Sequence, residues 1–85
     1  MKSYAVIFTY SFDCDSAVYL FDTFESATKF LESSYAEELR IDSEENGWDT
    51  TGLINDEKTY AKIENYFPEL NQTDITEFQI GNVYE

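Results

Sequence analysis

Carboxylates are the most abundant side chains in this sequence that could take part in catalysis or bind a ligand. Its 85 residues contain 18 Asp and Glu against five Lys and Arg, with one cysteine and no histidine, for a formal net charge of −13. Cys14 has no imidazole to activate it, and its neighbours Asp13 and Asp15 disfavour a thiolate. Two carboxylates that act together need a cleft to fix their separation, and a chain this short has little room for one. The sequence therefore predicts a protein that is not an enzyme and takes no cofactor.

Residues 42–47 have the spacing of the first half of a metal-binding loop. Oxygen ligands stand at positions one, three and five and a glycine at position six, as in a calcium-binding EF-hand loop. The rest does not fit, because Asp49 stands where an apolar residue belongs and Leu53 where a bidentate Glu belongs. We therefore expect no metal site, and interpret the segment as a charged helix end that stops at Gly47.

The densest charge lies in residues 32–49, which carry seven acids and one base, Arg40. A helix of that length spans about 27 Å, over which one DNA strand carries about eight phosphates. The stretch can therefore imitate a phosphate track in front of a basic groove. The alternative is a solvated helix face that is acidic for solubility. Four of the acids fall near the C-terminal end of the expected helix, where the macrodipole disfavours negative charge, so stability alone does not account for them.

The only tryptophan, Trp48, lies among these acids. A Trp in such a place suits an apolar anchor at an interface, although folding back over the sheet is an equally good interpretation. The predicted partner-binding residues are Glu37, Glu38, Asp42, Glu44, Glu45, Trp48 and Asp49.

The order of the expected elements indicates an α+β fold. Alternating apolar residues predict strands, and apolar residues at helical spacing predict one long helix. Asp22 and Glu25 form a capping box for that helix. Short connections imply a mostly antiparallel sheet of about five strands in a single domain, residues 1–85. The expected strands are 2–12, 17–21, 50–55, 59–66 and 75–84, with the helix at 23–45, in the order β-β-α-β-β-β.

The expected sheet is wider than its helix. Five strands span about 24 Å and one helix about 10 Å. The sheet must therefore curl strongly or leave aromatic surface for a partner or a second copy. The aromatic residues of the first strand are Tyr4, Phe8, Tyr10 and Phe12.

The charge also limits the partners. Nucleic-acid-binding proteins bring Lys and Arg to the phosphates, so we expect no direct binding to nucleic acid, and none to anionic membranes. A lone cysteine cannot form an internal disulfide, and the first residues enter a strand pattern rather than a signal peptide. These features predict a cytoplasmic protein.

In its size, its acidic stretch and its β-β-α-β-β-β order, the chain resembles the small acidic inhibitor proteins of bacteriophages and mobile elements. Many of these, including anti-CRISPR and anti-restriction proteins, mimic nucleic acid. The resemblance implies a basic nucleic-acid-binding partner, such as a nuclease or a CRISPR effector, and assigns no individual residue. The favoured hypothesis is thus a non-enzymatic protein that blocks a partner's basic groove. The alternative is a small cytosolic domain that dimerises through its aromatic sheet face.

Overall fold

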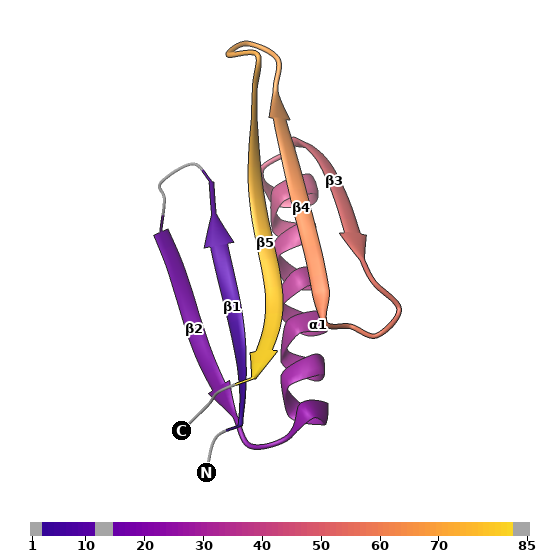
Figure 1. The fold of residues 1–85 in the computed structure, drawn as a ribbon. Coiled ribbons are helices and arrows are strands. Elements are labelled where there is room, and N and C mark those ends of the chain that lie inside the picture. Colours follow the sequence, from indigo (N-terminus) through magenta and orange to yellow (C-terminus); the bar gives the residue numbers. More distant parts are fainter. Residues whose placement is uncertain (1–2, 12–14, 83–85) are drawn as a thin grey trace.

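A computed structural model of the chain, which describes residues 3–11 and 15–82, contains a five-stranded sheet with one helix across it (Figure 1). The strand order is β2-β1-β5-β4-β3, and every neighbouring pair is antiparallel. The predicted α+β fold and the order β-β-α-β-β-β are therefore confirmed. The strands are β1 (Tyr4–Tyr10), β2 (Asp15–Phe21), β3 (Asp49–Ile54), β4 (Tyr60–Phe67) and β5 (Gln72–Asn82); helix α1 (Phe24–Arg40) continues into the π-helical segment η1 (Ile41–Glu45).

The N-terminal cap of helix α1 lies one residue later than predicted. Thr23 has extended backbone angles, and its hydroxyl accepts a hydrogen bond from the backbone N–H of Ser26 at 3.1 Å. The predicted cap at Asp22 is therefore wrong, because Thr23 is the capping residue and satisfies the N–H group of the third helical residue, Ser26. At the other end, Gly47 has a φ of 67°, the left-handed conformation that glycine adopts most readily, and the chain turns there as predicted.

The sheet face beneath α1 forms an aromatic core. The cross-strand partners Phe8 and Phe78 are both buried, and Leu31 of α1 is fully buried over them. Phe30, also on α1, stacks on Phe8 with 5.8 Å between the ring centroids. Tyr4 and Tyr10, on the same side of β1, pack against this cluster.

The sequence left two outcomes open for this wide sheet, strong curling or a free aromatic surface, and Tyr4, Phe8 and Tyr10 belong to the core rather than to a free surface. They face the helix because they alternate with Ala5, Ile7 and Thr9 along β1. Phe12 lies outside the described residues.

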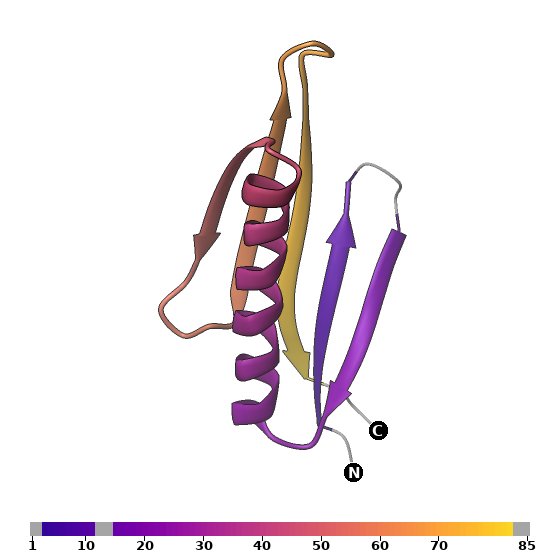
Figure 2. The same ribbon diagram turned by 180° about the vertical axis from the view of Figure 1, so that it is seen from behind.

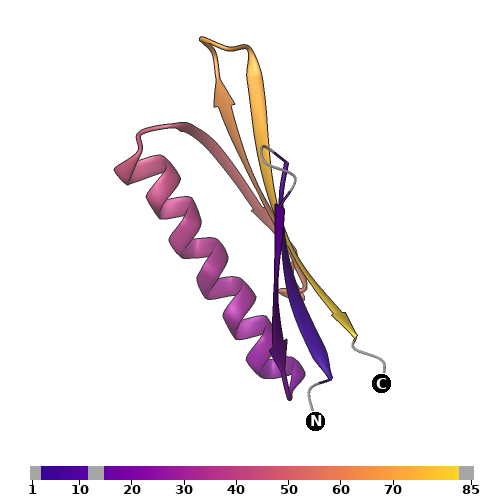
Figure 3. The same cartoon turned by 90° about the vertical axis from the view of Figure 1, so that its left-hand side faces the viewer.

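The strong twist of the sheet allows one helix to cover much of one face of its five strands. Figure 2 shows the helix in front of the sheet, and Figure 3, a side view, shows the helix on one side of the twisted strands. At one margin, Tyr19 of β2 remains 43% exposed. At the other, the helix comes so close to β3 that the side chains of Tyr35 and Leu39 lie against the backbone of Gly52.

The helix-free face of the sheet, toward the viewer in Figure 1, has two different halves. Over β1 and β2 it is aliphatic, with Val18 and Leu20 58% and 50% exposed. Over β4 and β5 it is polar. There Tyr60 Oη donates to Glu77 Oε2 at 2.6 Å, and this bond, aided by partial burial, raises the pKa of Tyr60 to about 12.

Candidate acidic interface

The predicted partner-binding residues lie at one end of the molecule, around η1, the start of β3 and the nearby β4–β5 turn (Figures 1 and 2). They do not form one straight track, because the chain reverses at Gly47 and Asp49 already belongs to the sheet. The exposed carboxylates of this region, called the acidic end below, are Glu37, Glu44, Glu45, Asp49 and Glu69.

Arg40 partly neutralises the acidic end. Its guanidinium lies 2.7 Å from Glu37 Oε1 and 3.4 Å from Glu45 Oε2. The hydrogen bond and the charge of Arg40 lower the pKa of Glu37. Five exposed carboxylates against one guanidinium still leave a formal charge of −4 at this end. Within the described chain, Glu44, Asp49 and Glu69 make no ion pair.

Asp42 does not belong to the exposed surface. It falls on the same line of the helix as Leu31, eleven residues or about three turns earlier, so it faces the sheet. Its side chain is only 3% exposed, and Oδ2 accepts a hydrogen bond from Asn65 Nδ2 at 2.9 Å. The prediction that Asp42 contacts a partner is therefore corrected: it is a buried acceptor inside the fold. The spacing from Leu31 was the signal in the sequence that pointed to this position.

Glu38 is also turned partly inward. It follows Leu31 by seven residues, about two helical turns, and is half-buried. Desolvation raises the pKa of its carboxyl, and the negative charges of Asp42 and Glu37 raise it further. Glu38 lines a hollow of about 390 Å³ beneath the helix end, together with Asp42, Asp74 and Asn65. Its charge is thus directed toward this hollow more than toward open solvent.

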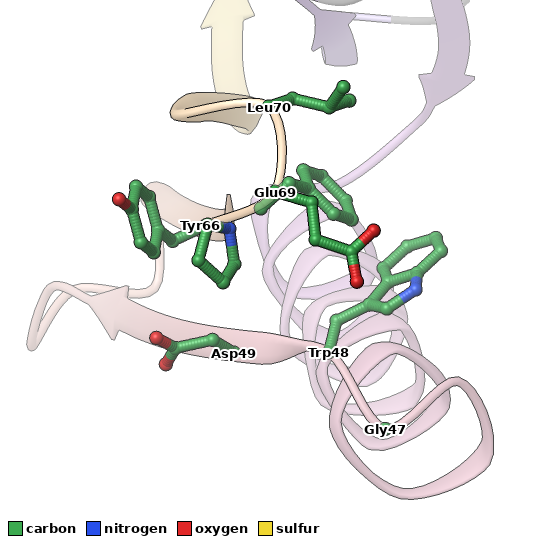
Figure 4. A pocket seen from close by; sticks show the side chains of 8 residues that line it. Gly47, Trp48, Asp49, Tyr66, Glu69 and Leu70 are labelled. Carbon is green, nitrogen blue, oxygen red and sulfur yellow. The ribbon is translucent and has the colours of Figure 1, made fainter.

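Trp48 lines a second hollow, of about 420 Å³, between the start of β3 and the β4–β5 turn (Figure 4). The indole is 42% exposed and meets Phe67 edge to face, with 5.2 Å between the centroids. Figure 4 shows the Glu69 side chain reaching over the hollow from the turn, while Asp49 lies further along β3. The residues lining this hollow, called the Trp48 hollow below, are Gly47, Trp48, Asp49, Tyr66, Phe67, Pro68, Glu69 and Leu70.

Sequence reasoning found Trp48 and Asp49 but missed the half of the hollow contributed by the β4–β5 turn. The sequence pattern predicts only the end of a strand and a loop for residues 66–70. Leu70, 70% exposed at a turn, is the feature that could have revealed it, because an apolar side chain gains nothing for folding there. Pairing of Asp49 with Tyr66 in the β3–β4 ladder brings the two segments together.

Comparison with known protein families, with curated proteins and with solved structures finds no match to this chain. In the described residues, no group of three or more His, Cys, Asp or Glu side chains is arranged to hold a metal ion. No helix in the same part of the chain is long and apolar enough to cross a membrane. Cys14 lies outside the described residues.

Proposed function

We propose that this chain is a non-enzymatic, cytoplasmic interaction protein whose acidic end occupies the basic, nucleic-acid-binding surface of a partner protein. The observation that carries the proposal is the half-exposed Trp48, set in an apolar hollow and surrounded by carboxylates. An aromatic anchor inside a charged rim is the usual anatomy of a protein interface. A partner that complements it must be basic, and nucleic-acid-binding proteins carry such surfaces.

The positions of the basic residues support binding to a basic protein rather than to nucleic acid. All four basic side chains in the described part of the chain already form ion pairs with acids, at 2.7–3.4 Å. They are therefore poorly placed to bind phosphate, and a net charge of −13 repels nucleic acid. The same charge steers the protein toward a basic surface and speeds association.

The test uses the whole protein on a solid support with a nuclease-treated bacterial lysate. We expect it to retain a nucleic-acid-binding protein at low salt and to release it as salt rises. The purified partner should then lose DNA or RNA binding as the acidic protein is added. A partner that binds the acidic protein and nucleic acid at the same time, without competition, would contradict the proposal.

A second candidate function, homodimerisation, is favoured by the aliphatic half of the helix-free face. On β1 and β2 this half contains no charged residue among the described positions, so two chains of charge −13 can meet there without bringing carboxylates together. β2 is also an edge strand, free to pair with a second copy. The residues of this half are Ala5, Ile7, Thr9, Ser16, Val18 and Leu20.

Light scattering over a range of concentrations tests the dimer. We expect a dimer that Val18→Lys converts to a monomer, since the substitution places two charges in the contact. Thr51→Lys, on the exposed far edge strand β3, is the matched control and should leave the dimer intact. A wild-type chain that is monomeric at every concentration would exclude this candidate.

A further inference from the structure

Trp48 and Phe67 form a wall shared by the two hollows of the acidic end. Pro68 and Leu70 line the hollow on one side of this wall, and Asp42 and Asn65 line the hollow on the other. None of the residues that line either hollow is basic. The carboxylates that line them are Glu38, Asp42, Asp49, Glu69 and Asp74.

A side chain that fits the Trp48 hollow must combine a flat or apolar body with positive charge. Lysine has the charge, but its ammonium is compact and strongly hydrated. The arginine guanidinium is planar, stacks on aromatic rings, is weakly hydrated and donates several hydrogen bonds to carboxylates. Stacking of a cation on an indole contributes about 0.5–1 kcal/mol at an exposed site and more when water is excluded. The aromatic and acidic lining thus matches arginine better than lysine.

We propose that the Trp48 hollow receives an arginine side chain of the basic partner, with the guanidinium against the exposed part of the indole and the carboxylate of Glu69 accepting its hydrogen bonds, while Asp49, further along β3, adds negative charge to the rim. This inference rests on the proposed function and adds its chemical specificity. Bulk charge attracts any polycation, whereas this hollow selects one basic side chain over another.

The probes are three lysine-rich peptides that are identical except for a central Arg, Lys or Leu. The fluorescence of Trp48 reports on the hollow directly, because the chain has no other tryptophan. At low salt we expect the Arg peptide to change the emission and to bind about two- to fivefold more tightly than the Lys peptide, from the stacking contribution of the guanidinium. The Leu peptide should bind no better than the Lys peptide.

Two double variants separate the hollow from general electrostatics. Asp49→Asn with Glu69→Gln removes the carboxylates at the hollow, whereas Asp56→Asn with Glu57→Gln removes the same charge at the β3–β4 turn. The first should abolish the preference for Arg, and the second should keep it. In calorimetry, Trp48→Leu should also lose the preference while retaining salt-dependent binding.

Equal affinity for the Arg and Lys peptides, or tighter binding of the Leu peptide, would overturn the inference and leave the proposed function standing. If no peptide binds at low salt and no basic protein is retained in the lysate experiment, both fail. If the double variant Asp49→Asn with Glu69→Gln still preferred the Arg peptide, the carboxylates of the hollow would not be the cause of that preference, and the inference would be overturned.

Discussion

The side-chain amide of Asn65 donates a hydrogen bond to Asp42 Oδ2 at 2.9 Å, and so ties η1 to strand β4. The amide oxygen of Asn65 accepts a hydrogen bond from the Thr50 hydroxyl at 2.6 Å, which fixes the orientation of the amide and leaves Asp42 as its acceptor. The backbone of Asp42 accepts in turn from the N–H of Trp48 at 3.0 Å. Asp42 thus positions Trp48 from within the fold.

Loss of this acceptor should destabilise the protein. Asp42→Ala leaves the buried amide of Asn65 without its partner, and we expect it to lower the free energy of unfolding by about 2 kcal/mol, the usual cost of an unsatisfied buried donor. Asp42→Asn keeps an acceptor in place and should cost less than half as much. Urea unfolding measures both. If the two variants lost the same stability, the hydrogen bond would not be the reason that Asp42 is buried.

The charge of Glu38 should oppose folding. Because its pKa is raised above the ordinary 4.5, the folded state holds the proton more tightly than the unfolded state, and stability falls as pH rises from 4.5 through the raised value. Glu38→Gln should therefore raise the melting temperature at pH 7, with the gain shrinking below pH 4.5. Glu37→Gln is the matched control. Arg40 lowers the pKa of Glu37, so its charge favours folding at neutral pH, and this variant should not gain stability. A loss for Glu38→Gln at pH 7 would refute this assignment.

Gly52 should not tolerate a side chain. A methyl group at this position would lie 2.9 Å from Leu39 Cδ1 and would also meet the Tyr35 hydroxyl, so the side chains of Tyr35 and Leu39 would have to shift from their packed positions. We expect Gly52→Ala to cost about 1–3 kcal/mol, as overpacked sites do. Gly81→Ala, also in a strand but with no atom near the new methyl group, is the control. Thermal melting of both variants provides the measurement, and equal melting temperatures would argue against the close contact.

The fold could be predicted because its strands and helix have distinct apolar periods. Aromatic and β-branched residues alternate between the two faces of the first strand, with Val6 and Phe8 on one face, and Ala27 and Leu31 recur at helical spacing. The predicted connection between the strands 59–66 and 75–84 was too long: Gln72–Asp74 pair with β4, and the turn is confined to residues 68–71, where Asn71 takes a positive φ. Hydrogen bonding across the ladder extended the strand beyond what side-chain pattern indicates.

The site was harder to predict than the fold. Charge alone marked Glu44, Glu45 and Asp49 and did not distinguish Asp42, which has the same side chain as Asp49 but an inward position. Whether a helical side chain is buried depends on the side of the helix on which it lies. The inward position of Asp42 could therefore be predicted only from its spacing to the buried Leu31. The pairing of Trp48 with Phe67 depends on tertiary structure, because the β3–β4 ladder brings together residues nineteen apart in sequence.

The central claim is that the acidic end, and not the total charge of the protein, binds the basic partner. Two variants with the same net charge separate these effects, because each removes four carboxylates and changes −13 to −9. The first changes the acidic end, by Glu37→Gln, Glu44→Gln, Glu45→Gln and Asp49→Asn. The second changes the first half of α1 and the β3–β4 turn, by Glu25→Gln, Glu32→Gln, Asp56→Asn and Glu57→Gln.

The decisive measurement is the association rate constant of each variant with the partner, taken from about 50 to about 200 mM salt. We expect the acidic-end variant to associate at least tenfold more slowly than wild type at low salt, with a weaker salt dependence, because steering depends on local charge. The second variant should stay much closer to wild type. If both variants associate at the same rate, or if the acidic-end variant binds as fast and as tightly as wild type, the acidic end is not the functional surface.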